Sequence, residues 1–176
     1  MQIGTLLAII LGSASLAGEV GRGSIDFLIS RPLSRRTILV HKMLAGGIIL
    51  SLSIWSTTLL LLLISFLQGL ENWTWILGAT AVSNVGLLVV YALAVLLSVR
   101  SSDSVKAGAL TGAILLVYSG LGLLQSFHRL SIFWHMKAFN WVLNDGPFPW
   151  LTLAVFALLV IILGFLAAKS FEAREI

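Results

Sequence analysis

The stretch Trp75–Val99 reads WILGATAVSNVGLLVVYALAVLLSV and contains no Lys, Arg, Asp or Glu. An α-helix rises 1.5 Å per residue, so roughly 20 apolar residues cross the 30 Å of hydrocarbon in a bilayer. The stretch is long enough for this, and it has no charged group that would keep it in water. It therefore predicts a membrane-spanning α-helix and places the chain among helical membrane proteins.

The composition of the whole chain agrees with this prediction. Of the 176 residues, 59% are hydrophobic and only 10% are charged. A soluble domain carries about a quarter of its residues as charges, so a water-facing surface is excluded for most of this chain. The chain has no Cys, which excludes disulfide and thiol chemistry.

Four further apolar windows flank the span at 75–99. Each lacks Lys, Arg, Asp and Glu, although the first is short for a span. They lie at residues 1–18, 44–67, 107–124 and 150–168. The sequence thus predicts an all-α transmembrane bundle of about five spans that forms a single domain over residues 1–176. We call residues 19–42, between the first two windows, the elbow.

Lys and Arg are distributed unequally between the two sides of this arrangement. The side of the elbow carries nine of them, Arg22, Arg31, Arg35, Arg36, Lys42, Arg100, Lys106, Lys169 and Arg174. The opposite side carries only Arg129 and Lys137. Because cytoplasmic loops are enriched in Lys and Arg, we expect a protein of the cell membrane with its N-terminus outside and its C-terminus in the cytoplasm.

The elbow reads EVGRGSIDFLISRPLSRRTILVHK. Residues 24–29 can form a short helix that ends before Pro32, since the residue preceding a proline is disfavoured in the α conformation. Ser34 is placed to cap a second helix, which continues into the next span. The basic residues alone suit contact with anionic lipid. Glu19 and Asp26 instead suit docking of a cytoplasmic protein, because mixed charges set the register of an interface.

The elbow resembles the signature of ABC-type-2 transporter permeases, the membrane subunits of one class of ATP-driven transporters. The matching positions are Glu19, Gly23, Leu28, Ser30, Pro32, Ser34, Arg35 and Lys42, and the ending FEAREI at 171–176 is also similar. The resemblance implies that the elbow includes a coupling helix that contacts a separate ATP-binding subunit. The elbow residues that we expect at this contact are Glu19, Arg22, Gly23, Asp26, Leu28, Ser30, Arg31, Pro32, Ser34 and Arg35.

The resemblance also implies the partners and the direction of transport. We expect an exporter permease that contacts membrane lipid, pairs with a second copy or a sister permease, and binds no nucleic acid. The sequence has no GxxxxGK phosphate-binding loop, so ATP and magnesium are expected on the separate ATPase and no cofactor in this chain. Members of the family usually have six spans, and this chain is expected to lack the first.

Two other classes of function are alternatives to the permease. A membrane scaffold or assembly factor could use the same elbow to dock a cytoplasmic partner that is not an ATPase. A membrane-embedded enzyme is the other alternative, but the sequence offers no candidate catalytic residues for it. It shows no catalytic triad, paired carboxylates or zinc-protease motif. We therefore expect a subunit without catalytic residues.

Residues 125–149, on the side opposite the elbow, are rich in aromatic residues. Apolar residues at helical spacing, interrupted by Lys137, predict an interfacial amphipathic helix that ends before Pro147. It would serve as an anchoring belt or as a gate that contacts substrate. His128 and His135 lie about 10 Å apart on such a helix, so with Met136 they do not predict a metal site.

The polar residues within the predicted spans have two readings. They either form hydrogen bonds between helices or line a transport path. They are Ser51, Ser53, Thr57, Thr58, Ser83, Asn84 and Tyr91. Gly108 and Gly112 form a GxxxG pattern, which favours close packing within the subunit or, alternatively, pairing of subunits.

Overall fold

The computed structural model describes residues 2–21, 34–70, 73–121, 131–138, 141 and 146–173. Within these ranges all regular structure is α-helical, in seven helices. They are α1 (Gln2–Ala14), α2 (Ala17–Gly21), α4 (Arg35–Leu67), α5 (Trp73–Arg100), α6 (Ser104–Leu121), α7 (Ile132–Met136) and α9 (Trp150–Glu172). The predicted all-α membrane bundle is confirmed.

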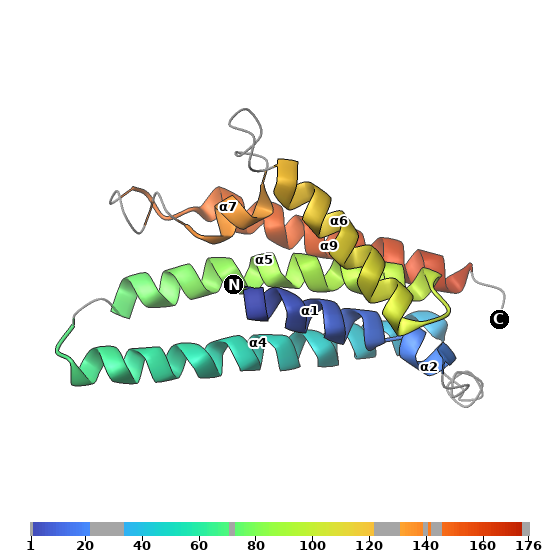
Figure 1. Ribbon diagram of the computed structural model, residues 1–176, viewed down its shortest axis with the longest axis horizontal. Helices are drawn as coiled ribbons and strands as arrows, with labels where there is room; N and C mark the ends of the chain where they lie inside the picture. Colours follow the sequence, from blue (N-terminus) through green and yellow to red (C-terminus); the bar gives the residue numbers. More distant parts are fainter. Residues whose placement is uncertain are drawn as a thin grey trace.

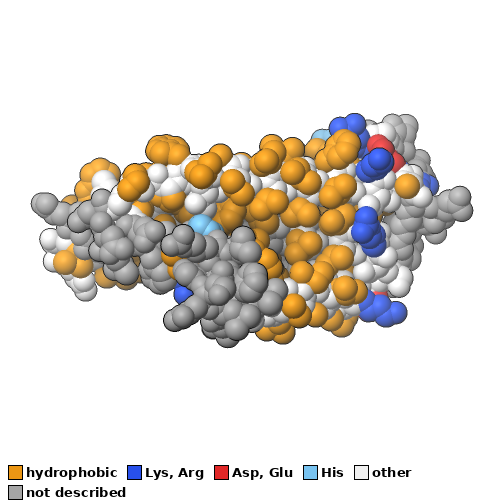
Figure 2. All heavy atoms as spheres, turned by 90° about the horizontal axis from the view of Figure 1, so that it is seen from above, with side chains coloured by type: hydrophobic (Ala, Val, Ile, Leu, Met, Phe, Trp, Pro, Cys, Tyr) orange, Lys and Arg blue, Asp and Glu red, His pale blue; other side chains and the backbone are white. Residues whose placement is uncertain are grey.

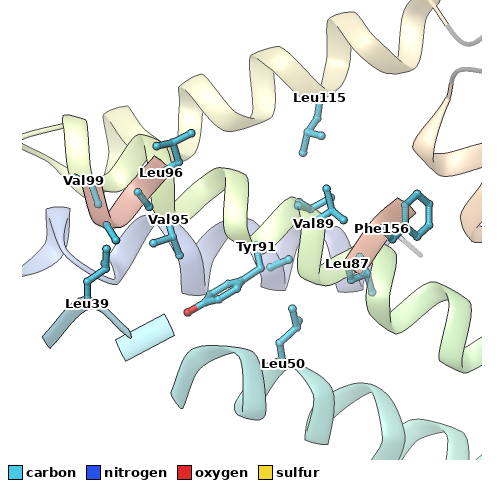
Figure 3. Packing of buried hydrophobic residues seen from close by; sticks show 14 of the residues in the cluster. Leu39, Leu50, Leu87, Val89, Tyr91, Val95, Leu96, Val99, Leu115 and Phe156 are labelled. Atoms are coloured by element: carbon cyan, nitrogen blue, oxygen red, sulfur yellow. The ribbon is translucent and has the colours of Figure 1, made fainter. Parts of the chain in front are cut away.

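Helix α5 is the centre of the bundle, and α1, α4, α6 and α9 pack around it (Figure 1). In the most apolar 18-residue window of α5, 72% of the residues are buried inside the bundle. The corresponding shares are 11% in α4 and 17% in α9. Val89, Tyr91 and Val95 of α5 belong to the buried core, which also takes residues from each surrounding helix (Figure 3). The apolar surfaces of α4 and α9 therefore face outward, as expected of helices in contact with lipid.

The helices differ in whether they are long and apolar enough to cross a membrane. Among the described residues, α4, α5 and α9 are long and apolar enough to span, whereas α1 and α6 are shorter apolar helices. The α1 helix has 13 residues, which is about 20 Å. Gly4 near its beginning faces Leu87 in the middle of α5. The N-terminus accordingly lies beside the middle of α5 (Figure 1). The predicted first span at 1–18 is therefore not one continuous helix, and the count of five spans stays a prediction.

The N-terminus of α4 forms as the sequence predicts. The Ser34 hydroxyl accepts a hydrogen bond from the Thr37 backbone N–H at 3.2 Å, in the geometry of an N-cap. From there α4 runs without interruption to Leu67. We call helix α2, which leads into the elbow, its first arm, and the first turns of α4 up to Lys42 its second arm. One helix thus includes both the second arm and the predicted span at 44–67.

Replacing Ser34 by Ala should loosen the first turn of α4. Loss of an N-cap hydroxyl costs about 1 kcal/mol, so amide exchange in this turn should become roughly fivefold faster. Hydrogen-exchange mass spectrometry of the purified protein measures this. Ser53→Ala is the control, because the Ser53 hydroxyl bonds only to the Ile49 carbonyl of its own helix. Equal exchange of the first turn in both variants would contradict the capping role.

Candidate functional site

The two arms of the elbow are joined by Lys42. Its Nζ donates to Glu19 Oε1 at 2.8 Å and to the Ser15 backbone carbonyl at 3.1 Å. The side chains of Lys42 and Glu19 are 24% and 23% exposed, so water and salt screen this pair less than a pair on the surface. We call Lys42, Glu19 and the Ser15 carbonyl the Lys42 cluster. It holds α2 against the first turns of α4.

The first arm is also anchored to α5, at a break between α1 and α2. A break in a helix leaves backbone N–H and C=O groups without partners inside the helix. The Ser98 hydroxyl of α5 supplies these partners. It accepts from the N–H groups of Leu16 at 3.1 Å and Ala17 at 2.8 Å, and it donates to the Ser13 carbonyl at 2.8 Å. Ser98 is fully buried, so water cannot replace it.

The second arm is anchored to α5 through Tyr91. Its hydroxyl lies within hydrogen-bond distance of the Lys42 carbonyl (3.3 Å) and the Met43 carbonyl (3.2 Å), and its ring points from α5 toward α4 (Figure 3). The hydroxyl also lies against Gly46, where any Cβ would collide with it. The absence of a side chain at Gly46 is what lets Tyr91 reach the backbone of α4.

Three of the ten elbow residues expected at a partner lie within the described residues. Glu19 belongs to the Lys42 cluster, Ser34 caps α4, and Arg35 is the first residue of that helix. The other seven, Arg22, Gly23, Asp26, Leu28, Ser30, Arg31 and Pro32, lie outside the described residues, as does the short helix expected at 24–29. Their contact with a partner stays a prediction.

Charged side chains gather at the end of the bundle that carries the elbow. Figure 2 shows Lys and Arg at one end of the molecule, next to a broad apolar surface. They come from the ends of four helices that meet there, namely Arg35, Arg36, Lys42, Arg100, Lys106 and Lys169. Arg100 donates to the Ser170 hydroxyl at 3.1 Å, which links the ends of α5 and α9.

Residues 1–128 match a family model described as an ABC-2 family transporter protein. The chain belongs to the ABC-2 transporter family. It is therefore a multi-pass membrane permease of an ABC transporter, a transport subunit that works with an ATP-binding cassette ATPase. The matched region includes the whole elbow and Ser98. No curated protein and no solved structure matches the chain.

The permease has an apolar groove between α4, α5 and α9. Its volume is about 810 Å³, and Met43, Gly47, Leu88 and Gly164 are among the residues that line it. Among the described residues that line it, the hydrogen-bonding side chains are Ser51, Trp55 and Tyr91, and Ser51 already bonds to Asn84 at 3.2 Å. The groove can therefore hold an apolar group, and none of the side chains that line it is charged.

The segment at residues 125–149, which we call the outer segment, packs into the bundle through its described residues. Met136 of α7 is fully buried against Gly86, at the middle of α5, and its carbonyl accepts from the Ser83 hydroxyl at 2.9 Å. Helix α7 is a single turn, and Ala138 beyond it takes a positive φ of 46°. Within the described residues, the predicted interfacial helix is thus reduced to the five residues of α7. It also lies deeper in the bundle than a helix at the membrane interface would. The side chain of Met136 packs inward, while His128 lies outside the described residues.

Most of the polar residues singled out in the spans bond between helices, whereas the Ser53 and Thr57 hydroxyls donate to backbone carbonyls of their own helix α4. The Thr58 and Thr80 hydroxyls lie 3.1 Å apart between α4 and α5, which adds to the Ser51, Ser83 and Tyr91 bonds described above. Gly108 faces Ser13 of α1, whereas a side chain at Gly112 would have no neighbour within 4 Å. The packing role predicted for the GxxxG pattern therefore applies to Gly108 but not to Gly112.

Sequence reasoning missed Ser98 and the Ser15 carbonyl. Ser98 is a single small polar residue in a long apolar run, and a backbone carbonyl has no signature in the sequence. The one available signal was the position of Ser98 beside Arg100, at the basic end of its span. That position places it level with the end of the predicted first span at 1–18, where backbone groups need partners.

Proposed function

We propose that this permease is the membrane subunit of an ATP-driven exporter of the cell membrane, and that its elbow docks the ATP-binding cassette subunit. The observation that carries the proposal is the Lys42 cluster, which fixes both arms of the elbow to each other at the basic end of the bundle. A rigid base lets a force on the elbow act on the helices instead of bending the elbow. ATP and magnesium would be bound by the partner.

The distribution of charge supports an orientation with the elbow in the cytoplasm. Lys and Arg of four helices lie at the elbow end, and cytoplasmic ends are enriched in these residues. The N-terminus would then lie outside and the C-terminus inside. Export as the direction of transport rests on the resemblance of the elbow to exporter permeases.

We further propose that two permease subunits, identical or related, form the transporter. The exposed apolar surfaces of α4 and α9 and the open face of α6 at Gly112 leave room for a second subunit. Binding of ATP would draw two ATPase subunits together, and the two elbows would transfer that movement to the permease halves.

Reversing the charge of Lys42 should weaken the docking of the ATPase. Lys42→Glu places two carboxylates side by side and removes the bond to the Ser15 carbonyl. A loss of about 1 kcal/mol corresponds to roughly fivefold less ATP-binding subunit retained on the permease. Glu19→Lys should act similarly, and the double exchange should restore part of the retention, because it re-forms the ion pair with opposite sense but leaves the Ser15 carbonyl without its donor. Copurification of the permease with a co-expressed ATP-binding cassette protein, chosen from the products of neighbouring genes, measures this.

Glu172→Lys is the matched control, since Glu172 is an exposed carboxylate at the same end of the bundle. It should leave retention unchanged. Absence of an ATP-binding protein from the wild-type preparation, with another cytoplasmic protein bound instead, would favour the membrane scaffold. Equal retention by wild type and both single variants would remove the Lys42 cluster from the docking role.

A further inference from the structure

The two anchor points of the elbow lie on one face of α5. Tyr91 and Ser98 are seven residues apart, which places them two turns apart on the same side of a helix, about 10 Å along its axis. Ser98 binds the first arm at the break between α1 and α2, and Tyr91 binds the second arm at the start of α4. The central helix thus contacts both arms through side-chain hydrogen bonds.

The Ser98 hydroxyl uses its full bonding capacity at this position. A hydroxyl has one donor and two acceptor sites, and the backbone groups of Ser13, Leu16 and Ala17 make its three shorter hydrogen bonds, while the Ser15 hydroxyl lies 3.5 Å away. These groups are buried, so each loses a partner if the hydroxyl is removed. Any displacement of α2 must therefore either move α5 with it or break these bonds.

The Lys42 cluster closes the linkage into a ring. It connects α2 to α4, Tyr91 connects α4 to α5, and Ser98 connects α5 back to α2. A force applied to the elbow is then shared by all three helices. Because α5 packs against every other long helix, its displacement rearranges the whole bundle.

We propose that Ser98 and Tyr91 are positioning residues that transmit movement of the elbow to α5. The proposal rests on the proposed function, because it takes the elbow as the point where the ATPase acts. It goes further by assigning the transmission to two hydroxyl groups outside the elbow. Docking of the ATPase does not require them, so their removal separates docking from transmission.

The test uses the full permease reconstituted with its ATP-binding subunit. Because the chain has no Cys, spin labels can be placed at two introduced cysteines, Trp73→Cys at the beginning of α5 and Trp150→Cys at the beginning of α9, both at exposed positions. The distance between the labels is measured with and without Mg·ATP. In the parent, Mg·ATP should shift the distribution of distances. Ser98→Ala should reduce the shifted population at least fivefold, a typical size for coupling between sites.

Tyr91→Phe is the second variant, since it keeps the ring and removes only the hydroxyl. It should reduce the shift as well, which keeps the test decisive if Ser98→Ala does not fold. Ser51→Ala is the control, because it removes a hydrogen bond between α4 and α5 away from the elbow. It should leave the shift intact, and all folded variants should retain the ATP-binding subunit.

The outcomes separate the two proposals. A normal shift in Ser98→Ala and Tyr91→Phe, or the same loss in Ser51→Ala, would overturn the transmission role and leave the docking proposal standing. A parent that binds no ATP-binding subunit and shows no shift would overturn the proposed function and, with it, this inference.

Discussion

Replacing Gly12 by Leu should push α1 away from α5 and destabilise the permease. A Cβ at Gly12 would lie 2.5 Å from the Cβ of Ala94 and 2.8 Å from the backbone carbonyl of Tyr91. The carbonyl belongs to the helical backbone of α5, which cannot turn aside as the tip of a side chain can. Overpacking of this kind costs about 1–3 kcal/mol, which corresponds to a melting temperature lower by roughly 2–12 °C.

Thermal melts in detergent, followed by the fluorescence of the Trp residues, measure this effect. Gly120→Leu on α6 is the matched control, because a side chain there would meet no described residue within 4 Å. Both variants exchange a helical Gly for Leu, so helix propensity changes equally in the two. If the two variants melted at the same temperature, α1 would not pack as closely on α5 as Gly12 indicates.

The sequence predicted the helices of this permease well, because their signal is local. Trp75–Val99 and 150–168 fall within α5 and α9, since long runs without charge permit little besides a spanning helix. Ser34 was identified as a cap for the same reason, because a cap needs only its own position and the three residues that follow.

The contacts of the elbow were predicted only in part. The resemblance singled out Glu19 and Lys42 separately, but it said nothing of their distance. Ser98 was missed because its role depends on a backbone break more than 80 residues away in the chain. Nothing in the apolar pattern of residues 1–18 marks that break, and the partner that stabilises it lies on another helix.

The outer segment is a second case in which a contact between distant parts of the chain could not be predicted from the sequence. The spacing of its aromatic residues predicted an amphipathic helix at the interface, and the exposed Lys137 agrees with such a position. Burial of Met136 depends on the notch that Gly86 leaves in α5, and that pairing is not visible in either stretch alone. Periodicity therefore indicated the kind of segment but not its depth.

Filling this notch should release the outer segment from the bundle. In Gly86→Leu the new side chain would collide with Met136, starting at its Cγ, close to the backbone of α7. Met136 is fully buried and the collision begins at its Cγ, so turning the tip of the side chain does not relieve it and α7 must move as a whole. A cost of about 1–3 kcal/mol raises the population of the released state roughly 5- to 150-fold.

A single cysteine at Ser131 reports this release. Ser131 is buried at the beginning of α7 and makes no capping bond, so Ser131→Cys changes little by itself. Labelling of this cysteine by a water-soluble maleimide should be slow in the parent and faster in Gly86→Leu by the factor given above. Adding Met136→Ala should restore slow labelling, because it vacates the space that the Leu needs. Gly120→Leu is the control, because a side chain there meets none of the described residues within 4 Å. If it accelerated labelling equally, the fit between Gly86 and Met136 would not be what holds the segment in place.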